Sequence, residues 1–144
     1  LSDPETVRYE PYRPMSREDA GEELQRRIAS NEMIAVELRD GGGLIGNVYL
    51  GRREFQSMEL GFVFNREYWG NGYASESCRA VLEKAFGEGR VYAECDPENE
   101  NSWRLLEALG FQREGYLRQN VYFWTDESGR PIWKDTYIYG KLHI

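Results

Sequence analysis

A strand that runs into a glycine turn and then into a helix constrains this chain more than any other feature. Apolar side chains alternate through residues 57–64, and this period of two predicts a β-strand with Glu59 in its interior. Gly70 and Gly72 follow, and a helical pattern begins at Ala74. Such glycines let the backbone approach a ligand, and a helix N-terminus attracts anions. The junction therefore predicts either a pyrophosphate site or a tight turn that needs positive φ.

Two common nucleotide-binding motifs do not fit this junction. Dinucleotide-binding loops read G-x-G-x-x-G, but Ser75 stands at the third glycine position. No strand-borne acidic residue lies obviously about 20 residues further on, where such a fold needs one. A Walker loop is excluded because the chain has no Gly-Lys-Ser or Gly-Lys-Thr sequence.

The remaining pattern predicts a mixed sheet flanked by helices. Short turns between strands favour antiparallel pairs, and helices between strands require crossovers. We therefore expect an α/β (α+β) fold with a mostly antiparallel sheet and at least one parallel pair. The expected helices cover residues 16–30, 74–86 (ended by Gly87 and Gly89) and 100–109, and the strands cover 34–38, 44–50, 57–64, 91–95 and two runs within 111–142 joined at 126–129.

The first helix is predicted to be amphipathic. Ser16 and Asp19 resemble a capping box, and apolar residues recur at four-residue spacing over residues 20–28. The preceding residues 1–15 carry three of the chain's five prolines and no periodicity, which indicates an irregular segment.

Charge and cysteine usage limit the partners. The 144 residues include 18 Lys and Arg against 25 Asp and Glu, a net charge of −7, which argues against nucleic acid and favours neutral or cationic partners. No run approaches the ~18 apolar residues of a membrane span. Two cysteines, Cys78 and Cys95, and no recognisable leader predict buried thiols in a reducing cytoplasm. No metal is predicted, because no cluster has metal-ligand spacing.

A second motif opens the last predicted helix. Residues 99–102 read Asn-Glu-Asn-Ser, and residues 109–111 close the helix with Leu-Gly-Phe. Residues 67–74 read Glu-Tyr-Trp-Gly-Asn-Gly-Tyr-Ala. In this order the segments resemble the GNAT acetyltransferase superfamily, whose coenzyme A turn reads Gln/Arg-x-x-Gly-x-Gly/Ala and whose later helix reads Asn-x-x-Ser followed by Gly-Phe.

The resemblance covers residues 19–142. Residues 59–64 and 135–142 look like the branch that includes the ribosomal-protein N-terminal acetyltransferases. It implies a single acetyltransferase domain over residues 1–144. Residues 3–14 look like what normally follows the family's first strand, so that strand is expected to be absent.

The resemblance also implies a sheet splayed between the strands that end near Phe64 and Cys95, with acetyl-CoA in the gap. An open strand edge suits the peptide-like pantetheine arm. Glu67 replaces the family's Gln or Arg, which places a carboxylate near the phosphates and predicts weaker cofactor binding. Carried over by position, the cofactor contacts are the backbone of Phe62, Val63 and Phe64, the turn residues Gly70, Asn71, Gly72, Tyr73 and Ala74, Asn99 on the pantetheine arm, and Ser102 near the sulfur.

Acetyl transfer to an amine needs a proton acceptor, oxyanion donors and a proton for the leaving thiolate. Glu59 is the candidate proton acceptor, directly or through water, or else a structural acceptor. Ser102 is the candidate donor to the thiolate, or else a helix cap, which Asn99 or Asn101 would serve equally well. The branch's own late carboxylate aligns with Val121, which weakens a transfer of that branch's substrate and mechanism.

These residues predict an acetyl-CoA-dependent N-acetyltransferase that acts by direct transfer. The expected partner is a primary amine, on a small molecule or a protein N-terminus. The alternative is a non-catalytic coenzyme-A-binding sensor or assembly module. Aromatic strands near the C-terminus could pair in a homodimer, and His143 is given no role. Candidates for the floor of the acceptor pocket, or else for the core, are Trp69, Tyr73, Tyr122, Trp124 and Trp133.

Overall fold

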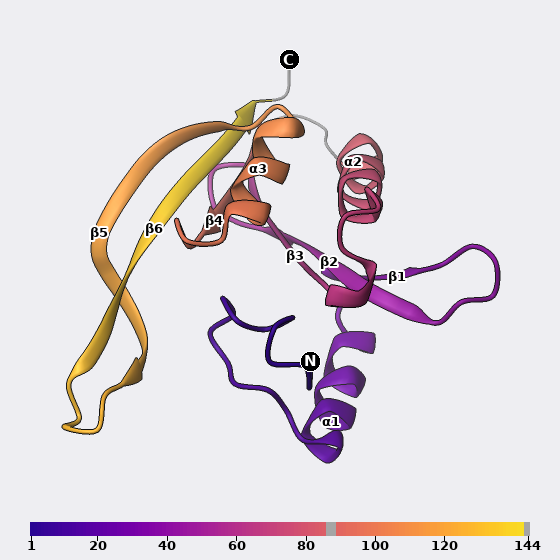
Figure 1. The fold of residues 1–144 in the computed structure, drawn as a ribbon. Helices are drawn as coiled ribbons and strands as arrows, with labels where there is room; N and C mark the ends of the chain where they lie inside the picture. Colours follow the sequence, from indigo (N-terminus) through magenta and orange to yellow (C-terminus); the bar gives the residue numbers. More distant parts are fainter. Residues whose placement is uncertain (86–88, 143–144) are drawn as a thin grey trace.

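A computed structural model describes residues 1–85 and 89–142 of the chain. Within that part, six strands form one sheet in the order β1-β2-β3-β4-β6-β5, with three helices around it (Figure 1). This confirms the predicted mixed, mostly antiparallel fold. The strands are β1 (Met33–Glu37), β2 (Leu44–Arg52), β3 (Ser57–Phe64), β4 (Arg90–Cys95), β5 (Gln112–Thr125) and β6 (Pro131–Leu142); the helices are α1 (Arg17–Ile28), α2 (Tyr73–Ala85), α3 (Glu100–Ala108) and the short 3-10 helix η1 (Arg66–Tyr68).

The sheet splays between its third and fourth strands. β3 and β4 run parallel, but their pairing begins at Ser57 with Arg90 and ends at Glu59 with Tyr92. Each strand keeps its antiparallel neighbour, β2 or β6, to its own end. The sheet therefore consists of two antiparallel parts that separate beyond Glu59, where the resemblance implied the gap.

The core lies on the face of the sheet that α2 and α3 cover. The period of two in β3 places Leu60 and Phe64 on this face, as predicted. Full burial of one large apolar side chain stabilises a fold by about 1.5–3 kcal/mol. The buried cluster comprises Ile45, Val48, Leu60, Phe64, Cys78, Leu82, Val91, Ala93, Leu106, Leu109, Phe111 and Tyr139.

Helix α1 lies away from this core and buries none of its residues. The Ser16 hydroxyl accepts a hydrogen bond from the Asp19 backbone N–H at 3.1 Å, so the predicted cap is confirmed. The predicted apolar face packs only loosely, because Leu24 is 43% and Ile28 67% exposed. The periodicity of apolar residues therefore predicted the helix, but it did not predict how little of the helix is buried.

Residues 1–15 form turns without a helix or strand, as predicted, and they contact both parts of the splayed sheet. Next to β3, the Thr6 hydroxyl accepts a hydrogen bond from the Arg66 backbone N–H at 3.1 Å. Next to β4, the Tyr9 hydroxyl donates to the Glu98 carbonyl at 3.1 Å. Figure 1 shows this segment between α1 and the β5–β6 hairpin. It therefore bridges the gap in the sheet.

Other predictions concern the end of the second expected helix and residue 143. Phe86, Gly87 and His143 lie outside the described residues. Gly89 has a φ of 103°, in the left-handed region that favours glycine.

A buried polar group joins α3 to the base of the β5–β6 hairpin. Tyr139 has no exposed surface, and its hydroxyl donates to the Glu107 carboxylate at 2.9 Å. The same hydroxyl accepts from Arg113 Nε at 2.9 Å, and the Arg113 guanidinium lies 3.8 Å from the centre of the Tyr137 ring. Three elements are thus connected through one oxygen atom.

Replacing Tyr139 with Phe should therefore destabilise the fold. Loss of both hydrogen bonds at a buried site is expected to lower the free energy of unfolding by about 1–2 kcal/mol in urea denaturation. Tyr116→Phe is the matched control, because Tyr116 is 54% exposed and its hydroxyl donates to Asp135 at the surface. Its effect should stay within about 0.5 kcal/mol. Equal losses in the two variants would contradict this account.

Candidate functional site

The loop between β3 and α2 holds two glycines in a conformation that other residues avoid. Gly70 has a φ of 78° and Gly72 of 79°, both in the left-handed region. An added Cβ would meet no atom within 4 Å at either position, so the backbone angle and not crowding requires glycine. The Asn71 side chain donates to the carbonyls of Tyr68 and Trp69, each at 3.2 Å. Asn71 therefore braces the turn from within.

The end of β3 forms one wall of the site, and the start of α3 forms another. Beyond the splay, residues 62–64 of β3 have no partner on the β4 side. The indole of Trp69 donates to the Phe64 carbonyl at 2.8 Å and ties the turn to this strand end. Asn99 caps α3, because its side chain accepts from the Ser102 backbone N–H at 3.4 Å. Ser102 is therefore not the cap, and its hydroxyl has no capping role.

These elements enclose a cleft of about 280 Å³. Glu67 is exposed and does not line the cleft. Every predicted cofactor contact except Asn71 does line it, namely Phe62, Val63, Phe64, Gly70, Gly72, Tyr73, Ala74, Asn99 and Ser102. The structure thus brings together residues from three separate segments of the chain.

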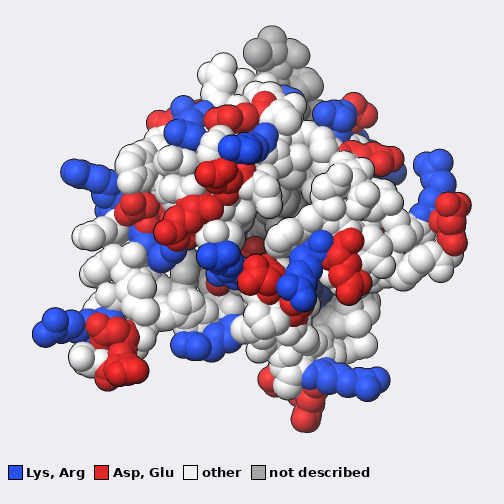
Figure 2. All heavy atoms as spheres, viewed as in Figure 1, with Lys and Arg blue, Asp and Glu red and all other residues white. Residues whose placement is uncertain are grey.

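A second cavity, of about 500 Å³, lies beside the splay and is rich in carboxylates. Figure 2 shows the molecule hollowed near the middle of the viewed face, with charged side chains around the opening. The basic side chains in this cavity are Arg27 and Lys134. The acidic ones are Glu10, Glu59, Glu94, Asp96 and Asp135. Carboxylates therefore outnumber cations, and the cavity favours a positively charged guest.

Glu59 lies in the wall of this acidic cavity and not in the cleft. Its carboxylate forms an ion pair with Arg53, with Nη2 2.8 Å and Nε 3.1 Å from Oε2. Partial burial, and then the nearby Glu59 charge, raise the pKa of Glu94 on the neighbouring strand. The ion pair places Glu59 at the edge of the cavity with one of its oxygen atoms already engaged.

Both cysteines are free thiols that remain protonated near neutral pH. Burial raises the pKa of Cys78 to about 12. Cys95 lines the acidic cavity, where burial and then the Asp96 charge raise its pKa to about 12. Since the thiolate is the nucleophilic form, neither cysteine is activated.

The cleft and the acidic cavity meet at a small set of shared residues. Ser102 lines both. Glu10 also lines both, and it was missed because it lies in an irregular segment where periodicity gives no signal. The other shared residues are Phe62, Val63 and Asn99.

The aromatic residues predicted for the floor of the acceptor pocket, or else for the core, lie in different parts of the structure. Trp69 and Tyr73 line the cleft. Tyr122 and Trp133 pack against each other on the hairpin, with ring centres 5.2 Å apart, and Trp124 lies under the Arg13 guanidinium at 4.4 Å. Val121, where the resembling branch has a carboxylate, does line the acidic cavity. The aromatic residues of that cavity are Tyr9, Tyr12, Tyr49, Phe62 and Phe123.

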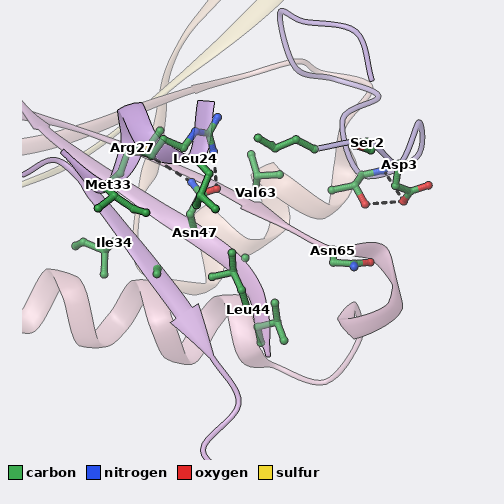
Figure 3. Close-up of a pocket in the computed structure, with 16 residues that line it drawn as sticks. Ser2, Asp3, Leu24, Arg27, Met33, Ile34, Leu44, Asn47, Val63 and Asn65 are labelled. Carbon is green, nitrogen blue, oxygen red and sulfur yellow. Dashed lines mark hydrogen bonds between the residues drawn. The ribbon is translucent and has the colours of Figure 1, made fainter. Parts of the chain in front are cut away.

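A third cavity, of about 480 Å³, lies between α1, β1, β2 and the first residues of the chain. Figure 3 shows apolar side chains from these elements around it, including Leu24 and Leu44, and the hydrogen bond of 2.9 Å from Arg27 to Asn47. Val63 alone among the predicted site residues contributes to its lining. This cavity is therefore separate from the predicted chemistry.

Within the described residues, no helix is long and apolar enough to cross a membrane. In the same part of the chain, no group of three or more His, Cys, Asp or Glu side chains is arranged to hold a metal ion.

Comparisons with known proteins agree on one family. The model of the acetyltransferase (GNAT) domain matches residues 1–112. The uncharacterized N-acetyltransferase YnaD of Bacillus subtilis is 35% identical, over 98% of this chain and 82% of that protein. A GNAT-family acetyltransferase from Bacillus anthracis superposes with a TM-score of 0.87 at 30% identity, over 98% of this chain and 83% of that one. The spermidine N-acetyltransferase of Vibrio cholerae, solved with CoA and spermine, gives 0.73 at 22% identity, over 98% and 84%. At that identity the likeness concerns the fold alone.

Proposed function

Because this chain belongs to the GNAT acetyltransferase family, we propose that it moves an acetyl group from acetyl-CoA to a primary amine by direct transfer. The observation that carries the proposal is the meeting of the glycine-turn cleft and the acidic cavity at Ser102. The cleft suits an anionic cofactor with a peptide-like arm, and the cavity suits a cation. An ammonium group on a small molecule or at a protein N-terminus has the required charge.

The cleft offers complementary groups for each part of acetyl-CoA. Backbone N–H groups at the start of α2, around Gly72, would hold the pyrophosphate with the help of the helix dipole. Along residues 62–64, the backbone groups that face away from β2 would pair with the amides of the pantetheine arm, except for the Phe64 carbonyl, which accepts from Trp69. Asn99 and Ser102 would complete the arm's path toward the acidic cavity.

Two side chains are proposed for the proton transfers. Glu59 would take up a proton from the acceptor, directly or through water, because it lines the cavity that receives the amine. The amine nitrogen then bonds to the thioester carbon, the carbon–sulfur bond breaks, and the sulfur needs a proton. Ser102, at the meeting point, would donate it and would regain a proton from the nitrogen, which loses its second proton as the amide forms.

Direct transfer is supported by the state of the cysteines. A route through an acetylated enzyme needs an activated nucleophile at the transfer point. Cys95 lines the cavity, but its pKa near 12 keeps it protonated.

A cytoplasmic location is also proposed. The free thiols Cys78 and Cys95 support it, because disulfides are rare in that reducing compartment.

Calorimetric titration with acetyl-CoA tests the cofactor, and Gly72→Ala tests the turn. A side chain at a φ of 79° costs roughly 1–2 kcal/mol, so binding should weaken by about tenfold. Gly21→Ala is the control, because Gly21 lies in α1 with open space around it. The control should bind like the parent chain and gain about 0.5–1 kcal/mol of stability. Absence of binding in the parent chain would contradict the proposal.

Glu59→Gln and Ser102→Ala test the chemistry. Each is expected to lower kcat by at least about tenfold, since proton transfer by a positioned side chain contributes 10² or more in typical enzymes. The assay follows thiol release with a panel of amines, and affinity for acetyl-CoA should be retained. Full activity in both variants would remove the assigned roles but leave the enzyme class. Binding without transfer to any amine would favour the sensor or assembly module.

A homodimer is proposed through the β5–β6 hairpin. This hairpin exposes about half of the surface of several large side chains, among them Tyr116, Tyr122 and Trp133. Light scattering should give twice the chain mass of 16.8 kDa, and Trp133→Glu should return it to the monomer. A parent chain that stays monomeric over a wide concentration range would contradict this association.

A further inference from the structure

One carboxylate stands where the two cavities meet. Glu10 lines both the cleft and the acidic cavity. The other described residues that line both have no side chain that ionises near neutral pH: Phe62, Val63, Asn99 and Ser102. Glu59, by contrast, lines only the acidic cavity. Within the described chain, Glu10 is therefore the one acidic group at the point where an acetyl donor and an amine would touch.

The backbone around Glu10 is fixed by contacts on both sides of the gap. Its N–H donates to the Val7 carbonyl at 3.0 Å, and Val7 is 3% exposed. Asp3 forms an ion pair with Arg66 at 3.3 Å, next to β3. The adjacent Tyr9 is bonded to the carbonyl of Glu98, next to β4. Glu10 is thus held between two anchors and does not depend on a free loop for its position.

Among the described residues, no cation is paired with the carboxylate of Glu10. The ion pairs among the described residues do not include Glu10, whereas Arg53 engages Glu59. Burial raises the pKa of Glu10, and the more distant Arg27 charge opposes this shift. A half-buried carboxylate without a cation is strongly stabilised by an incoming ammonium group.

The neighbouring Tyr12 carries a second polar group of this segment. Its hydroxyl is buried, lines the acidic cavity and lies close to the Arg27 guanidinium, but it makes no hydrogen bond of good geometry within the described residues. A buried hydroxyl without a partner is costly, so it suits a polar ligand group beside it. The Tyr12 hydroxyl can therefore accept a polar ligand group next to the Glu10 carboxylate.

We propose that Glu10 binds the ammonium group of the acceptor at this junction and takes its proton, an inference that rests on the proposed transferase function. The N–H bond breaks, and the proton passes to a Glu10 carboxylate oxygen. The freed electron pair of the nitrogen bonds to the thioester carbon, and the carbon–sulfur bond breaks. The nitrogen then loses its second proton, which reaches the sulfur through the Ser102 hydroxyl, so that an amide and a thiol are formed. Glu10 then releases its proton to water. Glu59, which lines only the acidic cavity, receives this proton through water and does not contact the amine.

The charged surroundings of Glu10 come from several elements. Arg27 lies on α1, Glu59 on β3, and Glu94 with Asp96 at β4. On the outer side of the segment lie Glu5, Arg8, Glu98 and Glu100, and from β6 come Lys134 and Asp135. Tyr9 and Tyr12 are the titratable neighbours on its own segment.

Glu10→Gln separates this role from a structural one, because Gln keeps the size and removes the charge. In the full chain, kcat/KM is expected to fall by about 10²-fold or more. For the parent chain, kcat/KM should decrease as the pH falls below the pKa of Glu10, because the protonated carboxyl cannot accept a proton. The variant should lose that inflection, whereas Glu59→Gln should retain it. Affinity for acetyl-CoA, measured by calorimetry, should change less than about twofold.

Glu22→Gln is the matched control, since Glu22 is exposed on α1 and lines none of the cavities described above. It should leave activity and pH profile unchanged. Glu10→Gln with the parent's kcat/KM and inflection would overturn the proposal, as would loss of the inflection in Glu59→Gln alone. A parent chain that binds acetyl-CoA but acetylates no amine would instead refute the transferase function, so the two failures are distinguishable.

Discussion

The structure depends on the early end of the pairing between β3 and β4. Strands that stayed paired along their length would leave no room for a ligand between them. Here pairing stops at Glu59, and the two parts of the sheet must be held by other contacts. Helices α2 and α3 pack over the core face, and residues 1–15 contact both parts from the other side. The gap is thus a stable feature with different chemistry on its two sides.

Charge is divided unevenly around this gap. The cleft that ends at the glycine turn offers backbone N–H groups and a helix start, which suit an anion. The neighbouring cavity carries five carboxylates and two basic side chains, Arg27 and Lys134. In that cavity Glu59 is paired with Arg53, whereas Glu10 forms no ion pair with any residue that the structure describes. A cleft that favours an anion and a cavity that favours a cation therefore lie within a few residues of each other. This arrangement suits a reaction between a phosphorylated donor and a cation.

Features that are determined by a few adjacent residues could be predicted from the sequence. The period of two in β3, the Ser16 cap and the need for glycine at positions 70 and 72 each follow from a few adjacent residues. Glu10 could not be predicted, because its place is set by contacts from residues 1–15 to Arg66 and Glu98, far along the chain. The places of the aromatic side chains could not be predicted for the same reason: composition shows that such rings are present, but not which side of the hairpin they occupy.

Strand β3 contributes to the core, to the acidic cavity and to the cleft, and this limits which changes of sequence and length it can accept. One set of alternate side chains, including Leu60, packs in the core, the other includes Glu59, and the free edge faces the cleft. A single-residue insertion within Ser57–Phe64 would exchange the two sets, moving a carboxylate into the core and an apolar side chain into the cavity. Length changes should therefore be tolerated at the exposed turn of residues 126–129, between β5 and β6, and hardly at all in β3.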